Sequence, residues 1–384
     1  MLKQNETYPN LNVKIGFVLY DYYPFGGLQE DCLATALAMQ AREHEVHIFT
    51  RTWKGERPKV VKTHILGKKG WSNLSRNQYF FESLSNELLD NQLDGVVAFN
   101  RIPESSIYFA ADPCFVERQK DLSWWRKLSL RYRYYAKLEA SIFKGIDSPE
   151  TLVLTQREIA AFHKHYDVPK ERFHLLPPGV ERINTTKNVR LENRAKLRKE
   201  IGTHSEATVA LFVGSGFRIK GLDRALSAIK ANRKSAKLLE FWIVGNGKEA
   251  RFKRMANESG VTVHFLGGQS DVARFYDAAD FLLHPAYSES AGKVLLEALT
   301  HGLPVLTTDT CGYAPHIIKA DGGIVIKSPF TQTSLNDSLV FMIQDINTRE
   351  YWSQNALQYA TNNDLYSCHK AAAMTIEQII EKNN

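Results

Sequence analysis

Residues 281–308 read FLLHPAYSESAGKVLLEALTHGLPVLTT, and this stretch decides the fold class. Its first four residues and its last four are short apolar runs typical of buried strands. Between them a helical pattern follows Glu289 and is terminated by Gly302 and Pro304. A strand, a helix and a second strand of these lengths predict the βαβ unit of a parallel sheet.

The same alternation extends in both directions from this stretch. Further strands are predicted at 209–213, 240–244 and 263–266 in the second half, and at 13–20, 46–49, 95–99 and 152–155 in the first half. A Gly26-Gly27 turn and a helix from 28 to about 42 follow the first strand. Strands that alternate with helices predict parallel sheets covered on both faces.

The length of the chain predicts two domains. Its 384 residues exceed the size at which a single core usually keeps growing. A polar, charged stretch at 181–206 separates the halves and is expected to be a linker with a helix of its own. We therefore expect an α/β protein with two doubly wound, Rossmann-like domains, 1–180 and 181–364, that face a central cleft. The helical pattern from about 351 to 382 predicts a C-terminal helix, about 365–384, that packs back on the N-terminal domain.

Composition narrows the class of protein. No segment approaches the roughly 18 consecutive apolar residues of a membrane span, and the first twelve residues are too polar for a secretory signal, so a cytoplasmic protein is expected. The cysteines at 32, 114, 311 and 368 have neither disulfide nor zinc spacing. We therefore expect free thiols and no metal.

The sharpest chemical motif is a pair of carboxylates, Glu289 and Glu297, eight residues apart across a helix start. Backbone N–H groups of Ala291, Gly292 and Lys293 at that start would bind an anion or a hydroxyl. One carboxylate would then hold a sugar hydroxyl and the other a ribose, with a pyrophosphate between them. The alternative is two ordinary surface glutamates of an amphipathic helix.

Two glycine-containing turns form the second set of candidates. The loop at 214–221, GSGFRIKG, joins a strand to a helix, and Arg218 and Lys220 would neutralise a diphosphate there. The loop matches neither the dinucleotide-binding fingerprint nor the phosphate loop of nucleoside triphosphatases, which disfavours dehydrogenase and kinase functions. YPFGGLQ at 23–29 would lie across the cleft, or would be a plain strand-to-helix turn.

A basic, aromatic segment carries most of the net charge. Between residues 118 and 137, seven basic residues oppose one acidic residue, a net +6 of the chain's +7. Cations mixed with Trp and Tyr suit a peripheral membrane contact, nucleic-acid binding, or a helix whose aromatic side chains pack inward. The candidate membrane-contact residues are Trp124, Trp125, Arg126, Lys127, Arg131 and Arg133.

Along the chain, the Gly-Gly turn at 26–27 comes first, the Arg/Lys loop at 214–221 second and the Glu289/Glu297 pair third. These three motifs in this order resemble the family 4 retaining glycosyltransferases of the GT-B fold. Within that family the chain is most similar to the branch that builds the lipopolysaccharide core, and the resemblance covers nearly the whole chain. The segments that carry it are FAAD at 109–112, LRYRYYA at 130–136, HKHY at 163–166, LLPPG at 175–179, LLHPAY at 282–287, GLPVLTTDTCGYA at 302–314 and DLYS at 364–367.

The resemblance implies a role for each candidate residue. Glu289, with the amides of residues 291–293, would hold the hydroxyls of a donor hexose, Glu297 the ribose, and Arg218 with Lys220 the diphosphate. Asp112 would stand against the hexose, Asp31 would face the acceptor or the sugar, and Gly26 and Gly27 would line the donor site. Two positions depart from the pattern, since Ile219 separates Arg218 from Lys220 and Gln269 replaces an expected Arg.

By the same resemblance the chain would move glucose, or a related hexose, from a UDP-sugar to an inner-core heptose of lipopolysaccharide with retention. It would do so at the cytoplasmic face of the anionic inner membrane, without nucleic acid. The chain has no Asp-x-Asp sequence, so no metal or other cofactor is expected. The alternatives are a nucleotide-sugar epimerase or hydrolase of the same fold, and an inactive nucleic-acid- or membrane-binding module.

Overall fold

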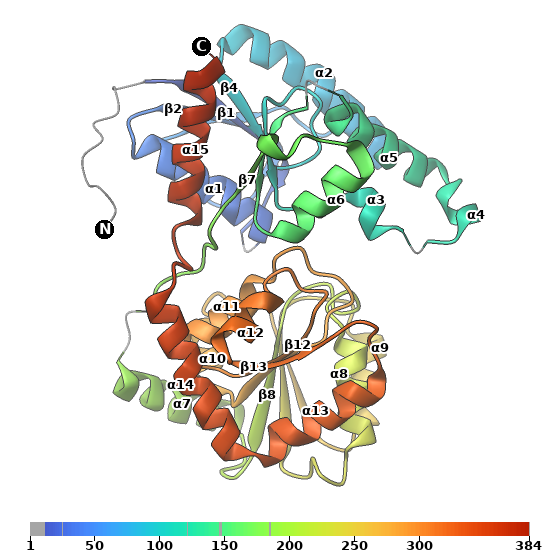
Figure 1. Ribbon diagram of the computed structural model, residues 1–384, viewed down its shortest axis with the longest axis vertical. Coiled ribbons are helices and arrows are strands. Elements are labelled where there is room, and N and C mark those ends of the chain that lie inside the picture. The colour runs from blue at the N-terminus through green and yellow to red at the C-terminus, as the bar shows by residue number, and fades with distance from the viewer. Residues whose placement is uncertain (1–11, 25, 121, 146–147, 184–185, 384) are drawn as a thin grey trace. The chain divides into compact units, whose positions relative to one another are not determined.

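The computed structural model describes residues 12–24, 26–120, 122–145, 148–183 and 186–383. The polar N-terminal stretch and Asp121, on which two sequence-based expectations drew, lie outside these ranges. The chain divides into two compact units, coloured along the chain in Figure 1. Unit 1 comprises residues 1–177 and 367–384, and unit 2 comprises residues 178–366.

Unit 1 is built on a seven-stranded parallel sheet with strand order β3-β2-β1-β4-β5-β6-β7. The strands are β1 (Lys14–Tyr22), β2 (Glu45–Trp53), β3 (Lys62–Ile65), β4 (Gly95–Ala98), β5 (Ile107–Ala110), β6 (Glu150–Val153) and β7 (Phe173–Leu175). The helices are α1 (Gly27–Gln40), α2 (Asn73–Asn91), α3 (Phe115–Arg118), α4 (Trp124–Lys127), α5 (Leu130–Phe143), α6 (Gln156–Tyr166), the short 3₁₀ helix η1 (Lys170–Arg172) and α15 (Cys368–Asn383). Apolar side chains of α2, α5 and α6 share one core cluster, while α1 packs against α15.

Unit 2 repeats the plan with a six-stranded parallel sheet of order β10-β9-β8-β11-β12-β13. Its strands are β8 (Thr208–Val213), β9 (Leu239–Val244), β10 (Thr262–Gly267), β11 (Phe281–His284), β12 (Val305–Thr308) and β13 (Gly323–Ile326). Its helices are α7 (Lys187–Ile201), α8 (Leu222–Ala231), α9 (Ala250–Asn257), α10 (Ala273–Ala278), α11 (Lys293–Thr300), α12 (Ala314–Ala320), α13 (Gln332–Gln344) and α14 (Ile346–Asn362). Figure 1 shows α8, α9 and α13 on one side of this sheet, and α10, α11 and α12 on the other.

The predicted α/β class with two doubly wound sheets is confirmed in each unit. The predicted strands are present within a few residues, and four short strands were not predicted, namely β3, β5, β7 and β13. All four cysteines are free and buried, as expected from their spacing.

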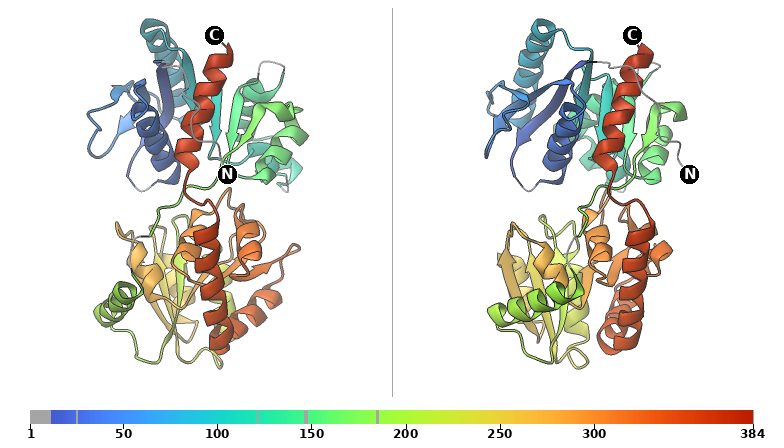
Figure 2. Two further views of the ribbon diagram at one scale, coloured as in Figure 1. Left: turned by 60° about the vertical axis from the view of Figure 1, so that its left-hand side comes forward. Right: turned by 90° about the vertical axis from the view of Figure 1, so that its left-hand side faces the viewer.

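The helix expected at about 365–384 is present as α15 in unit 1, but the expectation that the whole helical pattern from 351 packs on the N-terminal domain is wrong. The pattern from 351 to 382 is two helices, because residues 363–367 interrupt it. Only α15 belongs to unit 1, where Figure 2 shows it beside the sheet, whereas α14 packs on α11 and α12 in unit 2. Helical periodicity continues across the break, so the pattern alone does not locate it.

Candidate functional site

Two loops meet at the point where the strand order of unit 2 reverses. β8 and β11 are neighbours, but the chain leaves β8 toward β9 on one side and β11 toward β12 on the other. The loops that follow them, 214–221 and 285–292, therefore emerge side by side at the carboxyl edge of the sheet. Open α/β sheets bind ligands at such switch points.

Gly221 allows the two loops to touch. A Cβ atom on Gly221 would lie 2.0 Å from the carbonyl oxygen of Pro285, and the residue has φ of +80°. The backbone N–H of Tyr287 donates to the carbonyl of Ile219 at 2.9 Å, which joins the loops a second time. The sequence showed a glycine-rich turn after β8, and the structure shows that its last glycine makes the loop-to-loop contact.

Lys220 and Glu289 form an ion pair across these loops. The Glu289 side chain is only 15% exposed, and its Oε2 lies 3.6 Å from Nε2 of His284. Burial opposes ionisation, but the imidazole of His284 and the ammonium of Lys220 together lower the pKa of Glu289 to about 2. Glu289 is therefore a carboxylate at neutral pH and can accept hydrogen bonds from hydroxyl groups.

His284 is a member of this site that the sequence analysis quoted in a motif but did not select. His284 is 1% exposed, and its ring stacks on that of Phe212 with the ring centroids 5.8 Å apart. Neither ring nitrogen has a hydrogen-bond partner within the described part of the chain. A polar residue at the carboxyl end of a buried strand was the available signal, because such ends face the ligand edge of a parallel sheet.

The stretch from Glu289 to α11 has the predicted form of a strand-to-helix loop. Gly292 precedes the first residue of α11 with φ of +89°, and the helix starts at Lys293. The carbonyl of the buried Ala291 accepts the N–H of Tyr313 at 2.7 Å, which fixes the loop to the start of α12. Anion binding by the first amides of α11 stays a prediction.

Glu297 is partly buried in unit 2. The hydroxyl of Tyr276 in α10 donates to Oε2 of Glu297 at 2.6 Å. Burial raises the pKa of Glu297, and this hydrogen bond and the charge of Lys293 oppose the rise. The alternative of two ordinary surface glutamates is therefore wrong for this pair. Tyr276 was missed because it comes from a helix whose packing no local pattern reveals.

Arg218 and Gln269 occupy the two positions where the sequence departs from the family pattern. Arg218 is exposed in the 214–221 loop, while the side chain of Lys220, two residues on, turns to Glu289. Gln269 follows β10, where its amide donates to the carbonyl of Leu266 at 2.6 Å. Arg274 donates to the Gln269 side chain at 3.2 Å, so a guanidinium is still present near this position.

The candidates in unit 1 are held in place by contacts within that unit. Gly26 is the N-cap of α1, and Gly27 begins the helix with open space where a Cβ would be. The Asp31 side chain is 3% exposed, and its Oδ1 lies 2.9 Å from Nε2 of His369 in α15. The structure thus gives Asp31 a contact that secures the C-terminal helix, and its proposed role at a substrate stays a prediction.

Asp112 lies just after β5, beside a buried charge network. Its carboxylate interacts electrostatically with Arg101, which donates to Glu139 at 2.8 Å and to the Pro113 carbonyl at 2.7 Å. The fully buried Glu139 also accepts the backbone N–H of Phe115 at 2.8 Å. This network fixes the loop that carries Asp112, and no sequence motif marked it.

The basic, aromatic segment divides into an outward and an inward set. In α4, Trp124 and Trp125 are 75% and 57% exposed, and Figure 1 shows α4 at the edge of unit 1. The guanidinium of Arg126 lies 4.9 Å from the ring centroid of Trp125. Arg131 and Arg133 are exposed, and Lys127 donates to the Lys120 carbonyl at 2.8 Å.

The tyrosines of the same segment pack inward instead. The rings of Tyr132 and Tyr135 lie against that of Phe115, with ring centroids 5.5 and 5.7 Å apart. Tyr134 packs on the core cluster of unit 1. The alternative in which the aromatic side chains pack inward therefore holds for the tyrosines and not for the tryptophans. The exposed set also includes Leu128 and Leu130.

Among the residues that the structure describes, no helix is both long and apolar enough to cross a membrane. The same residues include no group of three or more His, Cys, Asp or Glu side chains arranged to hold a metal ion.

Comparison with known proteins identifies the family. The family model described as glycosyltransferase family 4 matches residues 25–182, and the one described as glycosyl transferases group 1 matches residues 193–359. The lipopolysaccharide glucosyltransferase WaaG of Escherichia coli K12 is 40% identical over 94% of this chain and 97% of its own. A D-inositol 3-phosphate glycosyltransferase of Corynebacterium glutamicum is 25% identical over 87% of both chains.

Solved structures agree with the sequence matches. The crystal structure of WaaG superposes with a TM-score of 0.89 at 39% identity, over 94% of this chain and 99% of that one. HepE of Anabaena, solved in complex with UDP and glucose, has a TM-score of 0.73 at 17% identity, over 96% of this chain and all of that one, and shows likeness of fold alone. This chain is therefore a glycosyltransferase that belongs to family 4, and its two parallel α/β units are those of the GT-B fold.

Proposed function

We propose that this glycosyltransferase transfers glucose, or a closely related hexose, from a UDP-sugar to an inner-core heptose of lipopolysaccharide, with retention of anomeric configuration and without a metal. The observation that carries the proposal is the 40% identity with WaaG over nearly the whole of both chains. The ionised Glu289 at the switch point of unit 2 supports it, since a sugar donor needs such an acceptor of hydroxyl hydrogen bonds.

In this proposal unit 2, corresponding to the predicted 181–364 domain, binds the donor. Glu289 holds hexose hydroxyls, and Lys220 and Arg218 face the diphosphate. The N–H groups of Ala291, Gly292 and Lys293 add the positive end of α11. These groups would stabilise the negative charge that develops as the nucleoside diphosphate leaves, a task that needs no metal ion when cations are placed there. Glu297 holds the ribose.

Unit 1, corresponding to residues 1–180 with the C-terminal helix, binds the acceptor in this proposal. Asp112 stands at the carboxyl end of β5, in a loop that the Arg101–Glu139 network fixes. Gly27 has open space at the start of α1, whereas a Cβ on Gly26 would lie 2.1 Å from Oε1 of Gln29; in this proposal both glycines line the donor site. Asp31 contributes from α1, where it also contacts His369.

We further propose that unit 1 contacts the anionic cytoplasmic face of the inner membrane. Trp124, Trp125 and their apolar neighbours are exposed beside arginines, and indole rings settle at the membrane boundary while arginines meet anionic headgroups. The acceptor is itself lipid-anchored, so such a contact would deliver the enzyme to it. Nucleic acid is not expected to compete for this surface.

The test of the activity is transfer of radiolabelled hexose from a panel of UDP-sugars to heptose-terminated core lipid, with EDTA present. Glu289→Gln should lose at least a thousandfold in kcat/KM, because an amide cannot replace both acceptor oxygens. Glu258→Gln, in an exposed ion pair of the same unit, is the matched control and should keep wild-type activity. Transfer that EDTA abolishes would refute metal independence.

The same assay separates the alternatives. Release of free sugar without labelled lipid would favour the hydrolase, and interconversion of donor sugars would favour the epimerase. Absence of turnover with every donor would favour a binding module. For the membrane contact, Trp124→Ala/Trp125→Ala should weaken binding to vesicles with anionic lipid at least tenfold, whereas Tyr351→Ala, an exposed aromatic change in unit 2, should not.

A further inference from the structure

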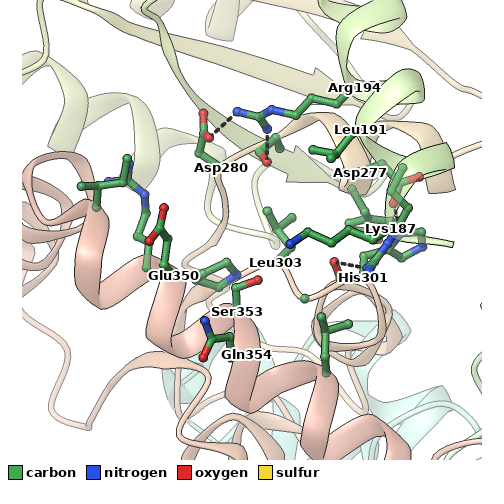
Figure 3. Close-up of a pocket in the computed structure, with 18 residues that line it drawn as sticks. Lys187, Leu191, Arg194, Asp277, Asp280, His301, Leu303, Glu350, Ser353 and Gln354 are labelled. Carbon is green, nitrogen blue, oxygen red and sulfur yellow. Dashed lines mark hydrogen bonds and ion pairs between the residues drawn. The ribbon is translucent and has the colours of Figure 1, made fainter.

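Unit 2 contains a cavity at the end of its sheet opposite the donor loops. The cavity has a volume of about 600 Å³ and lies between α7, α10, α14 and the turn that precedes β12 (Figure 3). Asp280 and Pro304 line it, and they immediately precede β11 and β12. The candidate donor residues follow the carboxyl ends of these strands, so the two sites occupy opposite ends of the same elements. The volume is that of a typical small-molecule site.

One face of α7 gives this cavity an excess of positive charge. Lys187, Arg190 and Arg194 are three and four residues apart, so they share a face of the helix, and all three line the cavity. Arg194 pairs with Asp280 at 2.7 Å. Arg190 donates only to the carbonyl of His301, at 3.2 Å, and its buried Nε has no partner within the described ranges.

Lys187 has no ion pair among the residues that the structure describes, and Figure 3 shows its side chain extending from α7 toward α14. Two of the three carboxylates that line the cavity are otherwise engaged. Asp277 pairs with His301 at 2.6 Å, and Asp280 also pairs with Arg198. On α14, Glu350 is exposed and also lines the cavity, while the buried Arg349 donates to the carbonyls of Met342 and Ile343. Two cations, Lys187 and Arg190, therefore lack a carboxylate partner.

The remaining walls of the cavity are partly apolar and partly hydrogen-bonding. Ser353 and Gln354 of α14 face the cavity across from Lys187 (Figure 3). The apolar lining is formed by Leu191, Leu303, Ile346 and Leu357. We propose that this cavity is a binding site for a small organic anion, a phosphate or carboxylate attached to an apolar body, with the anionic group on Lys187 and Arg190 and the body on the leucines.

The cavity also contacts the donor site through two rings. Tyr276 and His301 both line it, and their ring centroids are 5.3 Å apart. Tyr276 donates to Glu297, and His301 directly follows the last residue of α11. An anion that shifts these rings would change the surroundings of Glu297, so we propose that occupancy of the cavity changes the affinity for UDP. This second part rests on the proposed function, because it requires UDP to contact Glu297.

The binding part is tested with 1-naphthyl phosphate as the probe, by calorimetry and NMR on the full-length protein in saturating UDP. UDP blocks the donor site, so probe binding there is suppressed. Lys187→Gln/Arg190→Gln should weaken probe binding at least tenfold. Lys196→Gln/Lys199→Gln removes the same charge from exposed positions of α7 and should not weaken it. Neutral 1-naphthol should bind at least tenfold more weakly than the phosphate.

Three results would overturn the binding part: no binding of the phosphate, equal binding by the two double variants, or simple competition with UDP. The coupling is tested by the UDP affinity of the wild-type protein with and without saturating probe. The coupling is supported if saturating probe changes the UDP affinity of the wild-type protein at least threefold and this change is absent in Lys187→Gln/Arg190→Gln. An unchanged UDP affinity of the wild-type protein overturns the coupling. If the wild-type protein binds no UDP at all, the proposed function fails, while the paired double variants still decide whether the cavity binds the anion.

Discussion

Gly221→Ala separates the two donor loops and has a cost that can be worked out from their geometry. The new Cβ would lie 2.0 Å from the Pro285 carbonyl oxygen, whereas ordinary contacts begin at 3.4 Å, so the loops must move apart by about 1.4 Å. Overpacking of this kind costs about 1–3 kcal/mol. The left-handed φ of +80° adds about 1–2 kcal/mol for a residue with a Cβ. We expect a loss of about 2–5 kcal/mol in the unfolding free energy of unit 2.

Gly216→Ala in the same loop is the matched control. Its φ is +72°, but the nearest atom to the new Cβ, Cγ2 of Ile219, is 3.4 Å away. This variant should therefore show only the conformational cost, about 1–2 kcal/mol. The effect of both substitutions on the unfolded chain is the same and cancels in the comparison. The difference between the variants, about 1–3 kcal/mol, measures the contact between the loops.

The difference in unfolding free energy is measured by urea unfolding of fluorotryptophan-labelled protein, followed by ¹⁹F NMR. Trp242 and Trp352 belong to unit 2, so their signals report on the unfolding of that unit. UDP affinity is measured on the same samples. Lys220 directly precedes Gly221, so a displaced loop should also weaken UDP binding at least tenfold. Equal stability of the two alanine variants would refute the inference that Gly221 is required by the approach of the 285–292 loop.

Three further predictions follow from individual contacts. Tyr276→Phe leaves the partly buried Glu297 without this hydrogen-bond donor and should cost about 1–3 kcal/mol in the same urea assay; an unchanged midpoint would contradict the contribution of the hydrogen bond. Burial raises the pKa of Glu297, so UDP affinity should fall as the pH is lowered through a midpoint above the ordinary glutamate pKa of about 4.3. Tyr276→Phe removes a hydrogen bond to the carboxylate and should move this midpoint higher. A Kd for UDP that does not change with pH would argue against Glu297 as a ribose ligand. Asp31→Asn should weaken the contact with His369 and cost about 1 kcal/mol, seen as faster hydrogen exchange in α15 but not in α14; equal rates would show that the pair does not secure the C-terminal helix.

The candidate donor site could be anticipated from the sequence to the level of its loops. Both loops stand between a strand and a helix, and Glu289, Lys220 and Arg218 are carried on them. What the sequence did not indicate was how their side chains are paired. Lys220, expected at a diphosphate, contacts Glu289, and the buried His284 stands behind that carboxylate. Such pairings join residues that are far apart in the chain, so no spacing reveals them.

Whether a strand could be predicted depended on its local sequence pattern. Strands buried on both faces, such as β8 and β9, are continuous apolar runs and were predicted within a residue or two. The edge strand β3 (KTHI) is short and polar, and β7 spans only three residues, so neither has a pattern that stands out from a loop. Their places in the sheet are fixed by hydrogen bonding to β2 and β6.

By itself, the sequence determined the α/β class, the two repeated parallel sheets and the loops on which the chemistry is carried, because periodicity and glycine placement are local properties of the chain. Only the tertiary structure decided which charges meet. It placed Glu297 against Tyr276, linked Asp31 to His369, turned the tryptophans of α4 outward and placed Lys187 and Arg190 at a cavity. These features depend on the packing of distant segments, where burial and Coulomb interactions between neighbours in space, rather than neighbours in sequence, set the chemistry.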